Sequence, residues 1–186
     1  MNDIIEKYKL NLNKCLNSST MELVFYLAKN MKDAWENNNV IYFCGNGGSA
    51  GNANHLANDF LFGAGKKNGK GLRVESLCTN NSIITCLGND IGYENIFSEQ
   101  IRVKANKGDI LIALSGSGNS SNIINALKIA NNMEMITFAI LGFDGGQSKN
   151  IAKYPIHYEI NDMQVSEDMQ MIVGHICMQY LSNYKI

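Results

Sequence analysis

The chain has 186 residues, of which 45% are hydrophobic and 18% are charged, and its formal net charge is −1. This composition is typical of a globular protein, and the near-neutral charge gives no reason to expect nucleic acid or an anionic membrane as a partner. The sequence has no run of about 18 apolar residues, and its polar beginning is unlike a signal peptide. Five cysteines without C-x-x-C spacing are typical of reduced thiols, so we expect a cytoplasmic protein.

Two helices are predicted before any strand. Asn2 to Leu16 has apolar residues along one side, and Ser19-Thr20-Met21-Glu22 has the pattern of a capping box that begins a second helix. We expect this N-terminal helical hairpin, residues 1–38, to mediate assembly or to cover one face of a sheet. The length of the chain predicts a single domain over residues 1–186.

From Val40 onward, predicted strands and helices alternate. The central strands are continuous apolar runs, as expected for a parallel sheet that is covered on both faces. The pattern predicts an α/β fold, a three-layer α/β/α sandwich with a five-stranded parallel sheet. The predicted strands are Val40–Cys44, Arg73–Cys78, Asp109–Leu114, Met135–Leu141 and Pro155–Ile160. The predicted helices are Ala50–Phe62, Ser82–Leu87, Tyr93–Val103, Asn122–Ala130, Gly146–Ala152 and Val165–Tyr184.

A glycine-rich turn follows the first strand, with the sequence Cys44-Gly45-Asn46-Gly47-Gly48-Ser49. A strand, a glycine turn and a helix bring free backbone N–H groups and a helix N-terminus to one point, which attracts anions. Ser49 is a good N-cap and can also bind a ligand oxygen. The turn lacks both the lysine of a P-loop and the spacing of a dinucleotide fingerprint. By itself it fits a ligand loop and a plain tight turn equally well.

A second turn of this kind, Ser115-Gly116-Ser117-Gly118-Asn119-Ser120-Ser121, follows the third strand. Its hydroxyls are dense and no charged residue interrupts them. This composition suits a neutral cradle in which N–H and O–H donors hold a phosphate. Two such units in one chain favour ligand binding over a coincidence of ordinary turns.

Histidines and carboxylates recur at helical spacing in two places. His55 and Asp59 are four residues apart and share a helix face, while His175 follows Glu167 and Asp168 on the last helix. These groups could hold a metal, act as a base and an acid, or be structural. Glu167 and His175 are separated by about 12 Å along a regular helix. Either Glu167 lies on a bent first turn, or one of the two serves a neighbouring subunit; Asp168 is closer to the face of His175.

Three further features have open interpretations. Asn89 and Asp90 lie between glycines, in a segment that fits a plain turn and a ligand contact equally well. His157 alternates with apolar residues on a late strand and is interpreted as structural. The basic loop from Ala64 to Gly71 is interpreted as a solvated connection. The alternative is that one of its lysines contacts phosphate or a neighbouring subunit: Lys66, Lys67 or Lys70.

Together these features resemble the sugar-isomerase (SIS) fold and, within it, the family of bacterial phosphoheptose isomerases. The resemblance covers nearly the whole chain, and the order of the motifs is more specific than any one of them. The segments that carry it are CGNGGSAGNANHLANDF (44–60), LGNDIGYENIFSEQ (87–100), LSGSGNSSNII (114–124), LGFDGG (141–146) and SEDMQMIVGH (166–175).

The resemblance implies that sedoheptulose 7-phosphate is converted to D-glycero-D-manno-heptose 7-phosphate, a precursor of lipopolysaccharide or capsule heptose. It implies a cytoplasmic homotetramer with sites at subunit interfaces and one zinc ion per subunit. Asp59 then matches the catalytic base and His175 the general acid. The implied metal ligands are His55, Asp59, Glu167 and His175. The implied substrate contacts are Asn46, Gly47, Gly48, Ser49, Asp59, Asn89, Asp90, Ser115, Gly116, Ser117, Ser120 and Glu167.

The chain departs from the family pattern at three positions. Asp59 stands where the family usually has glutamate, Glu167 where it usually has glutamine, and an arginine that normally follows the base is absent. Two other functions therefore remain open. One is the isomerisation of another ketose phosphate, and the other is a non-catalytic SIS module that binds a sugar phosphate or a protein.

Overall fold

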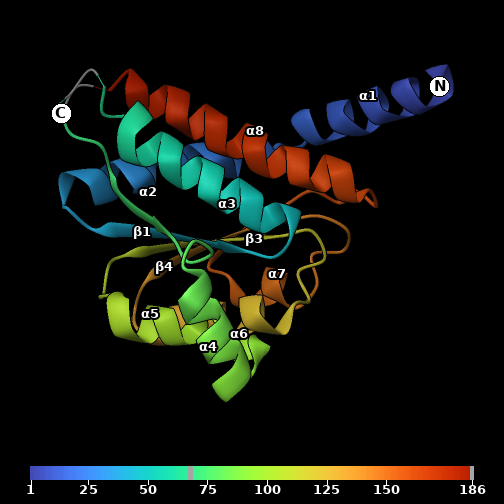
Figure 1. The fold of residues 1–186 in the computed structure, drawn as a ribbon. Coiled ribbons are helices and arrows are strands. Elements are labelled where there is room, and N and C mark those ends of the chain that lie inside the picture. The colour runs from blue at the N-terminus through green and yellow to red at the C-terminus, as the bar shows by residue number, and fades with distance from the viewer. Residues whose placement is uncertain (67–68, 185–186) are drawn as a thin grey trace.

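The computed structural model describes residues 1–66 and 69–184, which form a three-layer α/β/α sandwich (Figure 1). Its sheet has five parallel strands in the order β2-β1-β3-β4-β5. Helices α1, α2, α3 and α8 cover one face, and α4, α5, α6 and α7 lie on the other. The predicted fold class is confirmed. The strands are β1 (Val40–Gly45), β2 (Arg73–Ser76), β3 (Ile110–Ser115), β4 (Ile136–Leu141) and β5 (Tyr154–His157). The helices are α1 (Asn2–Leu16), α2 (Glu22–Glu36), α3 (Gly48–Asn58), α4 (Asn81–Asp90), α5 (Ser98–Lys104), α6 (Ser121–Asn132), α7 (Ser148–Ile151) and α8 (Met163–Ser182).

Alternation along β1 shows why its sequence is continuously apolar. Ile41 and Phe43 belong to the hydrophobic core under α2, α3 and α8, whereas Tyr42 and Cys44 belong to the core under α5 and α6. Successive side chains of a strand point to opposite faces, so a sheet with two covered faces needs apolar residues at every position.

Both N-terminal helices form as predicted, but the capping box does not. The hydroxyl of Ser18, not Ser19, accepts the backbone N–H of Thr20 at 3.2 Å, and a 3₁₀ turn, Ser19–Met21, precedes α2. The helices α1 and α2 each pack against α8. Tyr8 of α1 donates a hydrogen bond to the carboxylate of Asp168 on α8.

The remaining differences lie at element ends. The predicted helix Tyr93–Val103 divides into a 3₁₀ turn, Tyr93–Asn95, and α5. The predicted fifth strand stops at His157, because β5 pairs only with β4 and His157 lies beside Leu141, where β4 ends. In the basic loop, Lys70 donates to Asn38 and the ammonium of Lys66 lies over the ring of Phe62, whereas Lys67 lies outside the described residues. Within 1–66 and 69–184, no helix combines the length and apolar character that crossing a membrane requires.

The strand order brings the two glycine-rich turns together. In the order β2-β1-β3-β4-β5, the chain passes from β1 to β2 on one side and from β3 to β4 on the other side of the neighbouring pair β1 and β3. The helix after β1, α3, covers one face, and the helix after β3, α6, covers the other (Figure 1). Ligands of open α/β sheets bind in the crevice at the carboxyl ends of such a pair of strands. Each of the two turns begins at that edge.

Candidate active site

A cavity of about 280 Å³ lies where the two turns meet the beginning of α8. It is lined by every substrate contact that was predicted in the two turns, together with Glu167. Glycines let the backbone approach closely here, since a Cβ at Gly45 would lie within 3 Å of the Ser49 backbone. The lining residues are Asn46, Gly47, Gly48, Ser49, Leu114, Ser115, Gly116, Ser117, Ser120, Met163 and Glu167.

The hydroxyls of the second turn are arranged to donate into this cavity. Ser115 Oγ accepts the N–H of Gly118 at 3.1 Å, and Ser117 Oγ accepts the N–H of Asn119 at 3.3 Å. A hydroxyl that accepts from the backbone keeps its own proton for another partner. Ser120 is the N-cap of α6 and lines the cavity, so the N-terminus of this helix lies at the same space. The turn can therefore supply several hydrogen bonds to an anion.

An amide pair joins the two turns, and its second member, Asn122, was not predicted as a site residue. Each side-chain amide of Asn46 and Asn122 donates to the other at 2.8 Å, and Tyr93 donates to Asn46 Oδ1 at 3.0 Å. Asn122 is 1% exposed, and its Oδ1 also accepts the N–H of Ile123. Asparagine in a first helical turn is ordinary, so the sequence carried no signal for this contact. Asn46 is left with one side-chain N–H and its backbone for a ligand.

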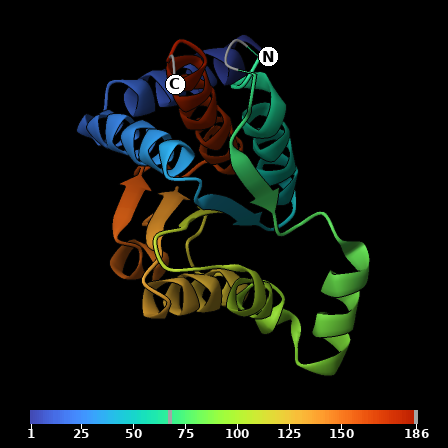
Figure 2. The same ribbon diagram turned by 90° about the vertical axis from the view of Figure 1, so that its left-hand side faces the viewer.

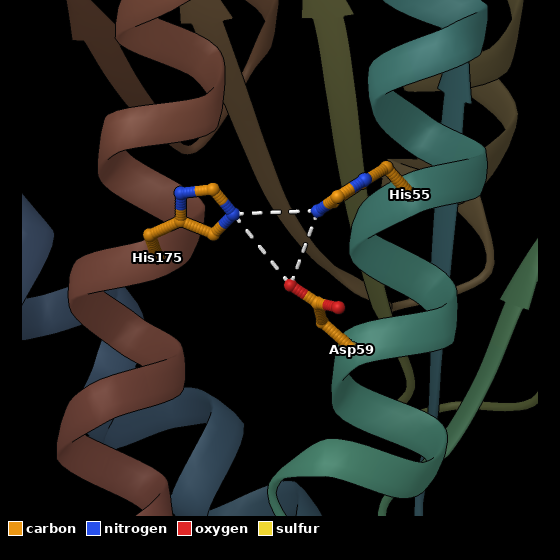
Figure 3. Close-up of side chains that lie close together, drawn as sticks. All are labelled: His55, Asp59 and His175. Carbon is orange, nitrogen blue, oxygen red and sulfur yellow. Dashed lines mark hydrogen bonds and ion pairs between the residues drawn. The ribbon is translucent and has the colours of Figure 1, made fainter.

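Farther along α3, three predicted residues converge on one point (Figure 3). Asp59 Oδ2 lies 3.4 Å from His55 Nε2 and 3.6 Å from His175 Nε2, and the two imidazole nitrogens are 3.4 Å apart. His55 lies on α3, Asp59 begins the π-helical turn Asp59–Gly63 that continues it, and His175 comes from α8. A π-helical turn inside a helix is frequent at functional sites.

Close packing of α3 and α8 makes this convergence possible. Leu56 of α3 fills the space beside Gly174, where an added Cβ would lie 2.2 Å from the Leu56 Cδ2 atom. Only glycine fits at such a distance, and the neighbouring His175 is thereby brought to face α3. The sequence motif contained Gly174, but its packing role depends on a partner 118 residues away.

The residues His55, Asp59 and His175, called the HDH cluster below, fit a divalent metal. Two imidazole nitrogens and a carboxylate oxygen are a common ligand set for zinc in catalytic sites, which keep a fourth position open. Tetrahedral zinc with bonds of about 2.0–2.1 Å requires ligand atoms about 3.3 Å apart. The three observed separations of 3.4–3.6 Å are close to that value.

The structure does not bring Glu167 into the HDH cluster. α8 is one continuous helix, and the carboxylate of Glu167 lies against Gly48, where an added Cβ would be 2.4 Å from Oε1. That position is the N-terminus of α3, which favours a negative charge. Asp168 also lies elsewhere, since it accepts the hydrogen bond from Tyr8. Of the two alternatives for Glu167, the bent first turn of α8 is therefore wrong.

Asn89 and Asp90 lie apart from the cavity. They are the exposed last residues of α4, and Asn89 Nδ2 donates to Asp90 Oδ1 at 2.8 Å. Figure 2 shows α4 extending away from the sheet and its other helices. The chain therefore presents these two residues outward, not to its own two turns.

The thiols near the first turn are structural. Burial raises the pKa of the Cys44 thiol well above its ordinary value. Burial also raises the pKa of the Cys78 thiol, against smaller opposing effects of hydrogen bonds with Gly45 and Ser76. The sulfur of Cys78 donates to the Gly45 carbonyl at 3.4 Å and so supports the turn. His157 is also structural as interpreted, with Nε2 at 3.0 Å from the Phe143 carbonyl.

Comparisons with known proteins agree with this architecture. Residues 9–142 match the model of the SIS domain family. A phosphoheptose isomerase of Aliarcobacter butzleri is 39% identical over 148 residues, which cover 80% of this chain and 78% of that protein. One of Helicobacter pylori strain P12 is 35% identical over 179 residues, 95% of this chain and 93% of that protein. This chain belongs to the phosphoheptose isomerase family.

A solved structure extends the likeness to three dimensions. The phosphoheptose isomerase of Neisseria gonorrhoeae matches with a TM-score of 0.91 at 27% identity, covering 98% of this chain and 97% of that one. The shared family and the shared fold confirm the resemblance that the motifs indicated.

Proposed function

We propose that this chain is an aldose–ketose isomerase that interconverts sedoheptulose 7-phosphate and D-glycero-D-manno-heptose 7-phosphate. The observation that supports this most is the pairing of an anion-type cavity with the HDH cluster on the same two helices. The phosphate is held by Ser115, Ser117 and Ser120 at the N-terminus of α6, and the sugar extends along α3.

The distance between the two parts suits a long sugar. Ser49 at the cavity and His55 in the HDH cluster are six residues apart on α3, which is about 9 Å along the helix axis. A phosphate bound in the cavity therefore leaves several carbons between it and the HDH cluster. This spacing favours a heptose phosphate over a triose phosphate.

Asp59 and His175 supply the proton transfers that isomerisation needs. The Asp59 carboxylate accepts a proton from one of the two carbons that exchange the carbonyl, which gives an enediol, and returns it to the other. The His175 imidazole donates a proton to the carbonyl oxygen as the enediol forms, and takes one back from the neighbouring hydroxyl as the new carbonyl forms, since histidine is suited to proton transfer near neutral pH. Glu167 and the N–H groups of Gly47 and Gly48 hold the sugar hydroxyls.

Zinc, one ion per subunit, is proposed as the cofactor of the HDH cluster. His55, Asp59 and His175 would hold it, and Glu167 is left out of the ligand set. With His175 Nε2 and Asp59 Oδ2 as ligands, a bound zinc ion would take over from His175 the stabilisation of negative charge on the substrate oxygens. Asp59 would keep its other carboxylate oxygen as the base.

The proposed assembly is a cytoplasmic homotetramer with the N-terminal helices in its interfaces. Phe25 and Tyr26 on α2 and Ile4 on α1 are exposed, as interfaces between identical chains require. Helix α4 projects away from the sheet (Figure 2). Its last residues, Asn89 and Asp90, would then contact substrate in a neighbouring subunit's site. A monomeric mass in light scattering at micromolar concentration would contradict this assembly.

Incubation with a panel of ketose phosphates, with and without added zinc, tests the activity. We expect the NMR signals of D-glycero-D-manno-heptose 7-phosphate to grow when sedoheptulose 7-phosphate is supplied. The product would feed lipopolysaccharide or capsule heptose. Turnover of only a different ketose phosphate would reassign the substrate. If no ketose phosphate reacts in either condition, a binding module becomes the better interpretation.

A further inference from the structure

A chain of buried and half-buried side-chain hydrogen bonds connects α3 and α8 beside the cavity. Gln170 of α8 is 1% exposed, and its Nε2 lies 3.0 Å from the hydroxyl of Ser49, which is 4% exposed. Gln170 Oε1 lies 3.0 Å from Asn52 Nδ2, which also lies 3.0 Å from the backbone carbonyl of Glu167. None of the sequence motifs assigned a role to Gln170 or Asn52.

The direction of every bond in this chain follows from its last member. A backbone carbonyl can only accept, so the Asn52 atom that faces Glu167 must be the amide nitrogen. The same nitrogen faces Gln170, whose nearer atom must therefore be its oxygen. The amide nitrogen of Gln170 then faces Ser49 and donates to it. The hydroxyl of Ser49 is an acceptor in this bond, and its own proton has no acceptor among the residues that the structure describes.

We infer that Gln170 is a positioning residue that holds Ser49 as a hydrogen-bond donor to the ligand. Ser49 lines the cavity, so a proton that is not used by Gln170 is available to a ligand oxygen there. Without the amide, a helical serine hydroxyl can turn and donate to a backbone carbonyl one turn earlier. The inference rests on the proposed function for the identity of the ligand, a sugar phosphate.

A double-mutant cycle tests the dependence on Ser49. Ser49→Ala and Gln170→Met are each expected to lower kcat/KM for sedoheptulose 7-phosphate about tenfold, the effect of one hydrogen bond. The kcat/KM of the double variant is expected to lie within about twofold of the value for Ser49→Ala alone. Gln170→Glu keeps the shape but accepts at both ends, so it should draw the Ser49 proton away and cause a similar loss. The inference would be overturned if the two losses in kcat/KM multiplied in the double variant. It would also be overturned if either Gln170 variant kept the parent kcat/KM.

The matched control is Gln179, which is exposed on the same helix. Gln179→Met and Gln179→Glu are expected to leave kcat/KM unchanged, and circular dichroism establishes that each variant is folded.

A second readout does not depend on turnover. In Ser49→Cys, the donated N–H of Gln170 stabilises the thiolate, so alkylation by iodoacetamide should begin at lower pH than in Ser49→Cys combined with Gln170→Met. Mass spectrometry of the labelled peptide should show the two pH midpoints about one unit apart. Equal midpoints would overturn the inference. If the parent protein does not isomerise sedoheptulose 7-phosphate, the proposed function fails separately and this measurement alone decides the role of Gln170.

Discussion

The cavity and the HDH cluster lie on the same two helices but are built in opposite ways. The cavity is made from turns, and most of its donors are backbone N–H groups and serine hydroxyls that also bond within their own turn. The HDH cluster is made from three side chains on helical segments: two come from α3 and its π-helical continuation, and one comes from α8. The first arrangement depends on local chain geometry, and the second depends on how two helices pack.

This difference predicts unequal sensitivity to substitution. An anion in the cavity is shared among many donors, so the loss of one should weaken binding moderately. In the proposed mechanism, each side chain of the HDH cluster has a role that no other residue can take over. Substitutions in the cluster should therefore reduce turnover and metal binding more than substitutions in the cavity reduce substrate affinity.

The largest effect is expected for Asp59→Asn, which keeps the shape of the side chain and removes the proposed base. General base catalysis typically contributes about 10²–10⁴-fold, so kcat should fall at least a hundredfold. Stopped assays with sedoheptulose 7-phosphate measure it, and Asp33→Asn on the exposed face of α2 is the control. A folded Asp59→Asn protein with the parent kcat would show that the base is another group.

Metal binding should respond nearly as strongly. His55→Ala removes one of the three proposed ligands in the HDH cluster. Mutating a residue that only supports a ligand already lowers metal affinity about 10–100-fold, so zinc affinity should fall at least a hundredfold here. Zinc content after dialysis, measured by mass spectrometry, is the readout. The control is His157→Gln, whose histidine lies against the Phe143 carbonyl. Unchanged zinc content in His55→Ala would remove the HDH cluster from consideration as the metal site.

A moderate effect is expected in the cavity. Ser117→Ala removes one proposed donor to the phosphate, and a hydrogen bond to a charged group is worth about 1.5–3 kcal/mol, so KM should rise roughly ten- to a hundredfold while kcat changes little. Ser19→Ala, at an exposed position far along the chain, serves as the control. A fall in kcat with unchanged KM would mean that Ser117 acts in the chemical step. A ligand-bound structure with phosphate elsewhere would also contradict the assignment.

The smallest effect should come from Tyr8→Phe, which tests the packing of α1 on α8 without changing the cavity or the HDH cluster. It removes the hydrogen bond to Asp168 and should lower the free energy of unfolding by about 1 kcal/mol, with kcat unchanged. Urea denaturation at neutral pH measures it, and Tyr180→Phe is the control. Burial and Asp168 raise the pKa of Tyr8 to about 12. Because the folded pKa is raised, this contribution is complete below about pH 10 and is lost as the pH rises through 12. If Tyr8→Phe and Tyr180→Phe lowered the free energy of unfolding equally at neutral pH, the predicted contribution of the Tyr8 hydrogen bond would be contradicted.

Much of the architecture followed from local sequence. The apolar runs predicted the central strands β1, β3 and β4, because a strand that is covered on both faces has few positions for polar residues. The two turns could be proposed as ligand loops because their donors lie within a few consecutive residues, and the structure places both turns at one cavity. His55 and Asp59 could be paired because residues four apart share one face of any helix.

What the sequence left open was decided by packing between distant segments. The close contact of Gly174 with Leu56 brings His175 to Asp59, and nothing in the spacing of α8 specifies which helix it faces. From the sequence, both Glu167 and Asp168 were candidates to lie near His175. In the structure, Glu167 lies against Gly48, and Asp168 accepts a hydrogen bond from Tyr8. Helical spacing determines which residues share a face, but the neighbour that covers that face is set only when the helices pack on the sheet.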